Sequence, residues 1–386
     1  MTYNAGGYGP PGSPAPGAAT PGYPPPGYQG YPPPPPSWQS PGYAPGYPGY
    51  GGPANRPPYG PPVLKPGVVP LRPLTLSDIF NGAVAYIRAN PKATLGLTTI
   101  VVVASQVIAL LLSLWPFAFT GQFAESLDGD TASTEVLVSW MASSLATVIT
   151  TALSTTLLSG LLTVVIGRAV FGAGITIGEA WRRLRPRAWT LIGFTVLKTL
   201  ALIVWFGLVL LLIVVTVAVV DGPLAFLIVA PLVLAAVLAA IWASVMLTFA
   251  PAAIVLERRD ILTSVKRSFA LIKGDFWRVF GIWLLAAVVA QFIAGAVSIP
   301  FSIGGQVVLT ASATTTAAMI SMVLFSVGGA VGQIITGPFS AGVTVLQYTD
   351  RRIRAEAFDL VLQTGAAAGP QAPADSTDDL WLTGAR

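Results

Sequence analysis

The chain has 386 residues, of which 53% are hydrophobic and only 10% are charged. Soluble domains carry about 25% charged residues, so this composition excludes an ordinary soluble protein and indicates an integral membrane protein. There is no Cys, which excludes disulfides and thiol chemistry, and no His, the usual general base near neutral pH. The net charge of +5 does not indicate nucleic-acid binding, because the cations flank apolar runs.

Residues 1–68 form a segment rich in Pro, Gly and Tyr, which holds most of the 34 prolines and no charge before Arg56. Such a composition buries too little apolar surface to offset the entropy of ordering, so it predicts a disordered tail with polyproline II character. The segment lacks the charged and apolar regions of a secretory signal peptide. Two interpretations stay open, a solvated tether and a docking platform for protein partners.

Six apolar stretches follow, each long enough to cross a bilayer, which takes about 20 helical residues. The predicted spans are 94–119, 136–165, 195–220, 224–256, 277–299 and 318–346. The predicted fold class is therefore an all-α integral membrane protein, with the membrane domain at residues 69–362. A flexible acidic C-terminal tail, residues 363–386, is expected after it. Asp221-Gly222-Pro223 predicts a tight turn, and residues 304–317 are expected to form an uncharged loop.

An amphipathic segment precedes each pair of spans. Residues 74–80 have the order apolar, Thr, apolar, small, acid, apolar, aromatic, and residues 175–181 repeat it. A looser third copy, in residues 257–280, aligns Asp260 with Asp78. We therefore predict three repeats, each a cytoplasmic amphipathic surface helix followed by a transmembrane hairpin.

The starts of the first two segments carry helix-capping signals. Thr75 or Ser77 is expected to cap the first helix, and Asp78 suits the positive end of its dipole. Thr176 and Glu179 fit the T-x-x-E capping box, in which each side chain satisfies a free backbone N–H of the other residue.

The third segment, residues 257–280, has the pattern of a basic amphipathic helix. Its cations Arg259, Lys266 and Lys273 recur every seven residues and share one helical face. The opposite, apolar set is Ile261, Leu262, Val265, Phe269 and Ile272. Such a helix is expected to lie in the membrane surface with its cations at anionic headgroups. The cations expected to contact headgroups of the inner leaflet are Arg182, Arg183, Arg185, Arg258, Arg259, Lys266, Arg267 and Lys273.

The Lys and Arg residues all fall on one side of the predicted topology. The three loops on the other side contain none, and the first of them, residues 121–135, is acidic. The positive-inside rule then places both termini and the surface helices in the cytoplasm. The expected location is the bacterial plasma membrane.

Three segments together resemble a bacterial family of six-helix membrane proteins named after the membrane domain of glycerophosphoryl diester phosphodiesterases, including its stand-alone members with Pro/Gly-rich tails. These segments are residues 72–91, 256–282 and 348–360. The C-terminal family motif is matched by Asp350, Arg351, Arg354, Glu356, Phe358 and Asp359, while Ala357 stands where Gly is usual. The resemblance implies a fold and a membrane location. The diesterase chemistry of that family belongs to a separate soluble domain that uses His, so the chain is not expected to be an enzyme.

Few residues within the spans suggest chemistry. No Asp or Glu falls in mid-membrane, and Lys198 is close enough to one end to extend its ammonium group to the interface. Three amides are expected to bond between helices: Gln106, Gln291 and Gln333. Gly328 and Gly332 form a G-x-x-x-G pattern that suits packing inside the bundle, with dimerisation as the alternative.

These features predict a non-enzymatic scaffold or interaction protein of the plasma membrane, without cofactor or metal. The expected partners are anionic lipids and proteins that dock on the tail, with no nucleic acid; the oligomeric state is left open. The mixed charges at residues 350–359 are expected to form salt bridges to the basic segments, with a binding site as the alternative. The alternative function is a lipid- or small-molecule-handling protein or transporter, suggested by prolines that would kink the spans and by the amides inside them.

Overall fold

The computed structural model describes residues 67–70, 72–120, 134–220, 222–312, 314–367 and 378–382. All of these residues lie in the unit that runs from Gly60 to Arg386. Predictions for residues 1–66 and for the acidic loop at 121–133 lie outside the described residues.

The described regular elements are all helical. The long helices are α2 (Pro91–Thr120), α3 (Thr134–Ala169), α4 (Ile177–Val219), α5 (Pro223–Met246), α8 (Phe276–Ala311) and α9 (Thr315–Glu356). The short ones are α1 (Leu76–Ala89), α6 (Ala250–Leu256), α7 (Ile261–Lys273), α10 (Phe358–Ala367) and the 3₁₀ turn η2 (Leu380–Leu382). Within the described ranges, six helices are long and apolar enough to cross a membrane, with α6 continuing the span of α5. The predicted all-α class is confirmed for the described residues, and so is the number of helices that could span a membrane.

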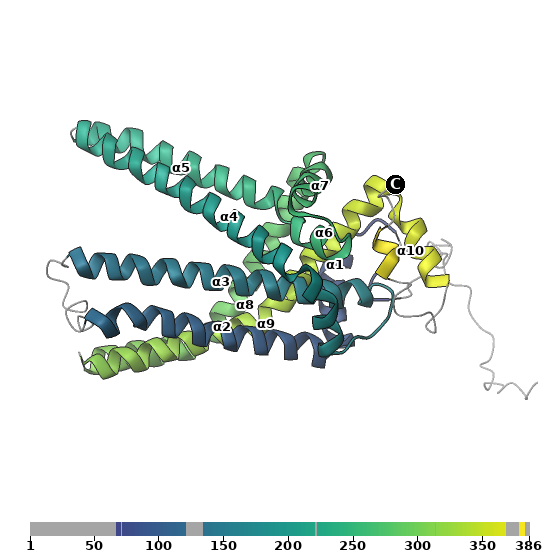
Figure 1. The fold of residues 1–386 in the computed structure, drawn as a ribbon, viewed down its shortest axis with the longest axis horizontal. Coiled ribbons are helices and arrows are strands. Elements are labelled where there is room, and N and C mark those ends of the chain that lie inside the picture. The colour runs from purple at the N-terminus through teal and green to yellow at the C-terminus, as the bar shows by residue number, and fades with distance from the viewer. Residues whose placement is uncertain are drawn as a thin grey trace, which may run out of the picture. The chain divides into compact units, whose positions relative to one another are not determined.

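The long helices pair as three consecutive hairpins with apolar outer faces. Helix α2 packs on α3, α4 on α5, and α8 on α9. Figure 1 shows the α4–α5 hairpin diverging from the other long helices. Its side chains Leu200, Val204, Leu208 and Phe226 are exposed. So much apolar surface is unfavourable in water but suits the hydrocarbon of a bilayer, where helices satisfy their own backbone groups.

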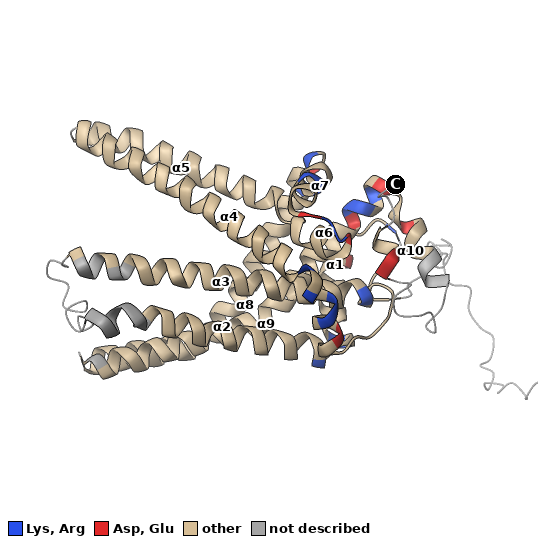
Figure 2. Cartoon of the chain, viewed as in Figure 1, with Lys and Arg blue, Asp and Glu red and all other residues tan. Residues whose placement is uncertain are grey.

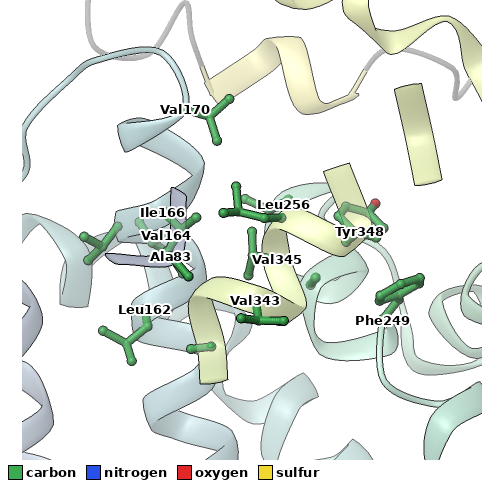
Figure 3. Packing of buried hydrophobic residues seen from close by; sticks show 14 of the residues in the cluster. Ala83, Leu162, Val164, Ile166, Val170, Phe249, Leu256, Val343, Val345 and Tyr348 are labelled. Carbon is green, nitrogen blue, oxygen red and sulfur yellow. The ribbon is translucent and has the colours of Figure 1, made fainter. Parts of the chain in front are cut away.

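The main buried core lies near one end of the hairpins. There α3 meets α1, α6 and the second half of α9. Figure 3 shows Leu162 and Ile166 of α3 close to Val343 and Val345 of α9, with Leu256 of α6 beside them. This end therefore holds the bundle together, and the charged residues described below surround it.

The three predicted surface segments differ in how they join their spans. Helix α1 ends at Asn90, and Pro91 opens α2, where its missing N–H is harmless. Helix α7 is separated from α8 by Gly274 and the N-cap of α8. The second segment does not form a separate helix, because α4 runs without a break through Pro186 into its span. No helix-ending pair such as Asn-Pro or Gly-Asp follows Pro186, which explains the difference.

The helix starts confirm the predicted caps and correct one alignment. Thr75 and Thr176 are N-caps, and each closes a capping box with the acid three positions later. Helix α7 uses the reverse order, because Asp260 is its N-cap and accepts a hydrogen bond from the Thr263 N–H at 3.2 Å. By position in its helix, Asp260 therefore corresponds to the two threonine caps and not to Asp78, so the predicted alignment of the third segment is off by three residues.

The turns at the far ends of the second and third hairpins are short. Gly222 has a φ of +67° and precedes Pro223, the first residue of α5, which confirms the predicted turn there. The predicted loop at residues 304–317 is wrong, because α8 extends to Ala311 and α9 begins at Thr315. Gly305 in α8 lets the Phe325 ring of α9 pack closely, because a Cβ on Gly305 would lie 2.6 Å from that ring.

The G-x-x-x-G pattern of α9 serves packing inside the chain. A Cβ on Gly328 would lie 2.8 Å from the Phe301 Cβ, and one on Gly332 would lie 3.2 Å from the Ala294 Cβ. Both partners belong to α8. The two glycines thus let α8 and α9 approach closely, as the packing interpretation predicts.

Candidate site at the charged end of the helices

Most of the described Lys, Arg, Asp and Glu residues gather at one end of the long helices, which we call the charged end; an exception is Lys198 in the middle of α4. Figure 2 shows this end, where α1, α7 and α10 lie, in blue and red, whereas the long helices beyond it are tan. Acids and bases alternate there, so a large part of the charge is paired within the chain. The pairs form two buried clusters and leave one cavity lined by arginines.

The first cluster surrounds Glu257, the C-cap of α6, whose side chain is only 3% exposed. Its carboxylate accepts hydrogen bonds from Arg259 Nε at 2.6 Å and from Arg267 Nε at 3.1 Å. Arg352 Nε lies 3.6 Å from the same carboxylate. The Tyr348 hydroxyl donates to it as well. Three hydrogen-bond donors and a fourth cation, from the α6–α7 connection, α7 and α9, therefore converge on one buried acid.

A second acid, Glu356, balances the positive charge of this cluster. It accepts from Arg352 Nε at 3.1 Å and pairs with Arg267. We call Glu257, Arg259, Arg267, Tyr348, Arg352 and Glu356 the Glu257 cluster. It joins the end of α6, helix α7 and the end of α9.

The Glu257 cluster is held in its ionised form. Burial opposes ionisation of Glu257, but the Tyr348 hydroxyl and the charges of Arg352 and Arg267 outweigh it and lower the pKa of the carboxyl. Burial likewise opposes the charge of Arg267, but Glu257 and Glu356 raise the pKa of its guanidinium. Both shifts favour charged partners, which is typical of a structural ion network.

Arg352 also links the cluster to the end of the chain. Its side chain is 1% exposed, and its guanidinium carbon lies 4.0 Å from the centre of the Phe358 ring and 6.0 Å from that of Trp381. Its Nη1 donates to the Trp381 carbonyl at 3.1 Å. Trp381 is buried and contacts the Phe171 ring edge-on. Residues 378–382 thus pack on the helices, unlike the flexible tail predicted for residues 363–386.

The second cluster surrounds Asp350, whose side chain is 2% exposed. Its carboxylate accepts from the Leu74 N–H at 2.8 Å, from Arg354 Nε at 2.9 Å and from Arg278 Nη2 at 3.2 Å. Both arginines also donate to the Leu74 carbonyl, at 2.8 Å for Arg278 and 3.1 Å for Arg354. The Asp350 cluster therefore ties the entry to α1 to the start of α8 and the end of α9.

The C-terminal motif residues fall on two helices. Arg351 pairs with Asp275 and donates to the Leu271 carbonyl at 2.9 Å, so the predicted salt bridges to the basic segments are present. Ala357 separates α9 from α10 with a φ of +50°, a conformation that favours glycine. Asp359 lies beyond this break and forms no ion pair with any described residue.

The cations predicted to contact lipid headgroups divide into two groups. Arg183, Arg259 and Arg267 pair with carboxylates of the chain: Arg183 with Asp378, the other two with Glu257. The exposed ones are Arg182, Arg185, Arg258, Lys266 and Lys273. Arg258 lies 3.6 Å from Asp379. The second group alone presents its cations outward.

Helix α7 packs most of its predicted apolar face against the bundle, since Ile272 is buried and Ile261, Val265 and Phe269 contact the core. Two serines share this inner face, and one predicted member of the set does not. Ser264 and Ser268 are fully buried, whereas Leu262 is 68% exposed. The Ser268 hydroxyl donates to the Met246 carbonyl at 2.6 Å and accepts from the Phe249 N–H at 3.2 Å. Those backbone groups are free because the chain breaks between α5 and α6. The serines therefore dock α7 on this break.

A cavity of about 360 Å³ lies beside η2. Its arginines come from α3, α4 and the α6–α7 connection: Arg168, Arg183, Arg187 and Arg258. Asp378 and Trp381 close one side, and apolar residues such as Val164 and Leu256 form the rest of the wall. We call it the arginine cavity.

The family described as "Domain of unknown function (DUF7847)" matches residues 74–351, more than half of the chain. The chain belongs to this family. The searches of curated proteins and of solved structures found no match. The DUF7847 interval begins at Leu74 and ends at Arg351, so both of its borders lie at the Asp350 cluster. The family description carries no function, and the resemblance to the diesterase membrane domain stays a prediction.

Sequence reasoning missed several residues at the charged end. The position of Glu257 in the sequence could have indicated an ion pair, because Glu257 directly follows an apolar span and precedes Arg258 and Arg259. Arg168 and Arg187 likewise flank spans. Trp381 is an isolated aromatic residue in an acidic segment, which indicates a docked segment. Among the described residues, no group of three or more acidic, His or Cys side chains could hold a metal ion.

Proposed function

We propose that this protein is a non-enzymatic, multi-pass protein of the bacterial plasma membrane that acts as a scaffold or interaction protein. The observation that carries the proposal is the separation of charge in Figure 2, with ionic residues at one end of six apolar helices. By the positive-inside rule, the charged end faces the cytoplasm together with both termini. The Pro-rich residues 1–66 would then recruit protein partners on that side.

The structure supports a lipid-contacting role for part of the charged end. Arg182, Arg185, Lys266 and Lys273 are exposed and form no ion pair with any residue in the described ranges. A cation near an anionic leaflet contributes about 1 kcal/mol. The buried clusters supply a rigid base for these cations. The three hairpins, each preceded by a capped helix start, also support an origin from three repeats.

The orientation can be tested with single cysteines, because the chain has none. Ser312 is exposed at the α8–α9 turn, and Ala270 is exposed on α7. Ser312→Cys is expected to react with a membrane-impermeant maleimide in intact cells, and Ala270→Cys only after permeabilisation. Ser264 is unsuitable because it is buried. The reverse labelling pattern would refute the proposed orientation.

The lipid contact can be tested by replacing Arg182, Arg185, Lys266 and Lys273 together with Gln. In nanodiscs that mix phosphatidylglycerol with phosphatidylcholine, the native protein is expected to retain the anionic lipid preferentially through its exposed cations. The variant should lose at least about tenfold of that preference, since each cation contributes about 1 kcal/mol. Mass spectrometry of the retained lipids measures it. The matched control swaps Lys and Arg at the same positions and should behave as the native protein; an unchanged preference in the Gln variant contradicts the role.

A second function, the handling of a lipid or small molecule, is favoured by a cavity of about 310 Å³ between α3 and α9. Its polar lining is Thr155, Ser159, Gln333, Thr336, Ser340 and Thr344. Ser159→Trp would fill this cavity. Native mass spectra that show a bound molecule in the native protein and none in Ser159→Trp would favour this function, and identical spectra would count against it.

A further inference from the structure

The lining of the arginine cavity carries more positive than negative charge. Four arginines line it, and the one carboxylate in its lining is that of Asp378. Asp379, which lies 3.6 Å from Arg258, is not part of the lining. Planar guanidinium groups recognise phosphate with paired hydrogen bonds, and several arginines around one cavity are a common arrangement for that purpose.

One buried nitrogen of Arg168, a residue of this lining, has no hydrogen-bond partner in the described chain. Arg168 is 8% exposed, and its Nε makes no hydrogen bond with any residue that the structure describes. A buried guanidinium normally has an acid or a carbonyl at each edge, because an unpaired buried charge is unfavourable. Arg168 also borders the cavity, so an anion inside would satisfy it.

The cavity already holds an anion that belongs to the chain. Asp378 pairs with Arg183, and the segment that carries it is anchored by Trp381. The Trp381 ring packs 5.1 Å from the Phe358 ring, and its carbonyl accepts from Arg352. The Asp378 carboxylate therefore occupies the position beside Arg183 where a phosphate oxygen would bind.

We propose that the arginine cavity binds a phosphate group, and that residues 378–382 compete with this ligand through Asp378. A volume of about 360 Å³ is enough for a phosphate with a small organic substituent. The proposal deepens the proposed lipid contact, but it concerns arginines that the surface cations do not include. Release of the C-terminal segment would open the site, and occupation of the site would favour release.

The same phosphate chemistry can come from a lipid headgroup or from a soluble phosphate compound. Arg168 lies at the end of α3, and Arg183 and Arg187 lie near the start of α4. The cavity is therefore at the ends of two spans, level with the headgroup region of a bilayer. Its apolar wall residues Val164 and Leu256 would suit the start of an acyl chain or glycerol backbone.

The test uses the full chain in detergent micelles and isothermal titration calorimetry with three probes: inorganic phosphate, glycerol 3-phosphate and dioctanoyl phosphatidic acid. Arg168→Gln is expected to weaken binding at least tenfold. Asp378→Asn is expected to strengthen it severalfold, because the internal competitor is removed. Arg88→Gln, an exposed cation of α1 outside the cavity, should leave binding unchanged.

Arg187→Gln provides a second variant if Arg168→Gln does not fold, because Arg187 is only half-buried and has no partner in the described part of the chain. Binding of phosphatidic acid alone identifies a lipid headgroup site, and equal binding of the soluble probes identifies a soluble ligand. No saturable binding of any probe, or binding that both arginine variants leave unchanged, would overturn the proposal. Replacement of the four surface cations should not affect this titration, so the two proposals can fail separately.

Discussion

Glu257→Gln is expected to destabilise the protein by about 3–5 kcal/mol, the cost typical of removing one partner from a buried ion pair. Three arginines would lose their shared counter-charge, and Arg352, at 1% exposure, cannot reach water instead. The Tyr348 hydroxyl would lose a charged acceptor at the same time. Unfolding in detergent, followed by intrinsic fluorescence, measures the change.

Asp359→Asn is the matched control for this substitution. It removes a carboxylate from the same end of the chain, at a position with no ion pair among the described residues, so its effect should stay within about 0.5 kcal/mol. If both variants unfold alike, the Glu257 cluster does not stabilise the fold.

The stabilisation by Glu257 should also depend on pH in a defined direction. The pKa of its carboxyl is lowered in the folded protein from an ordinary value of 4.5. The unfolded state therefore binds the proton more tightly, and the carboxylate stabilises the fold fully only above about pH 5. Below that pH the difference in unfolding free energy between the native protein and Glu257→Gln should shrink. A constant difference down to low pH would contradict the ionised cluster.

Local properties of the sequence were sufficient for the spans, the caps and the distribution of charge. The length of an apolar run decides whether it can cross a bilayer, and Thr176 needs only the acid three residues later to close its capping box. The ion clusters are different, because their partners are distant in sequence. Leu74 and Asp350 are 276 residues apart, and Glu257 and Tyr348 are 91 apart. The composition of the chain indicates that such charges pair with one another, but the packing of the helices determines which residues form each pair.

Two small residues show how partners on other helices decide a position, which the sequence alone does not reveal. Ser268 is a polar residue, yet it is buried because the α5–α6 break offers it a free carbonyl and a free N–H. Gly305 reads as a loop residue, yet it is helical because Phe325 packs against it. In both cases the neighbouring helix outweighs the ordinary preference of the residue.

The docking of α1 on α9 depends on the absence of a side chain at Gly342. A Cβ there would lie 2.6 Å from the Tyr86 ring and 2.9 Å from the Ala83 Cβ, and 3.1 Å from the Ala83 Cα. The last of these is backbone, so α1 itself would have to move. Tyr86 is fully buried and donates to the Pro338 carbonyl, and burial raises the pKa of its hydroxyl well above the ordinary value. The hydroxyl therefore stays a donor, and it would lose its acceptor if α1 shifted.

Gly342→Leu is accordingly expected to destabilise the protein by about 3 kcal/mol, since overpacking costs about 1–3 kcal/mol and an unsatisfied buried hydroxyl a similar amount. The matched control is Gly281→Leu in α8, where no atom lies within 4 Å of the added Cβ. That change should be neutral or slightly stabilising, because leucine favours a helix over glycine by somewhat less than about 1 kcal/mol. Thermal unfolding in detergent compares the two variants. Equal melting temperatures would mean that the packing of α1 on α9 at Gly342 does not stabilise the protein. The contacts of the Asp350 cluster with Leu74 would then be what keeps α1 in place.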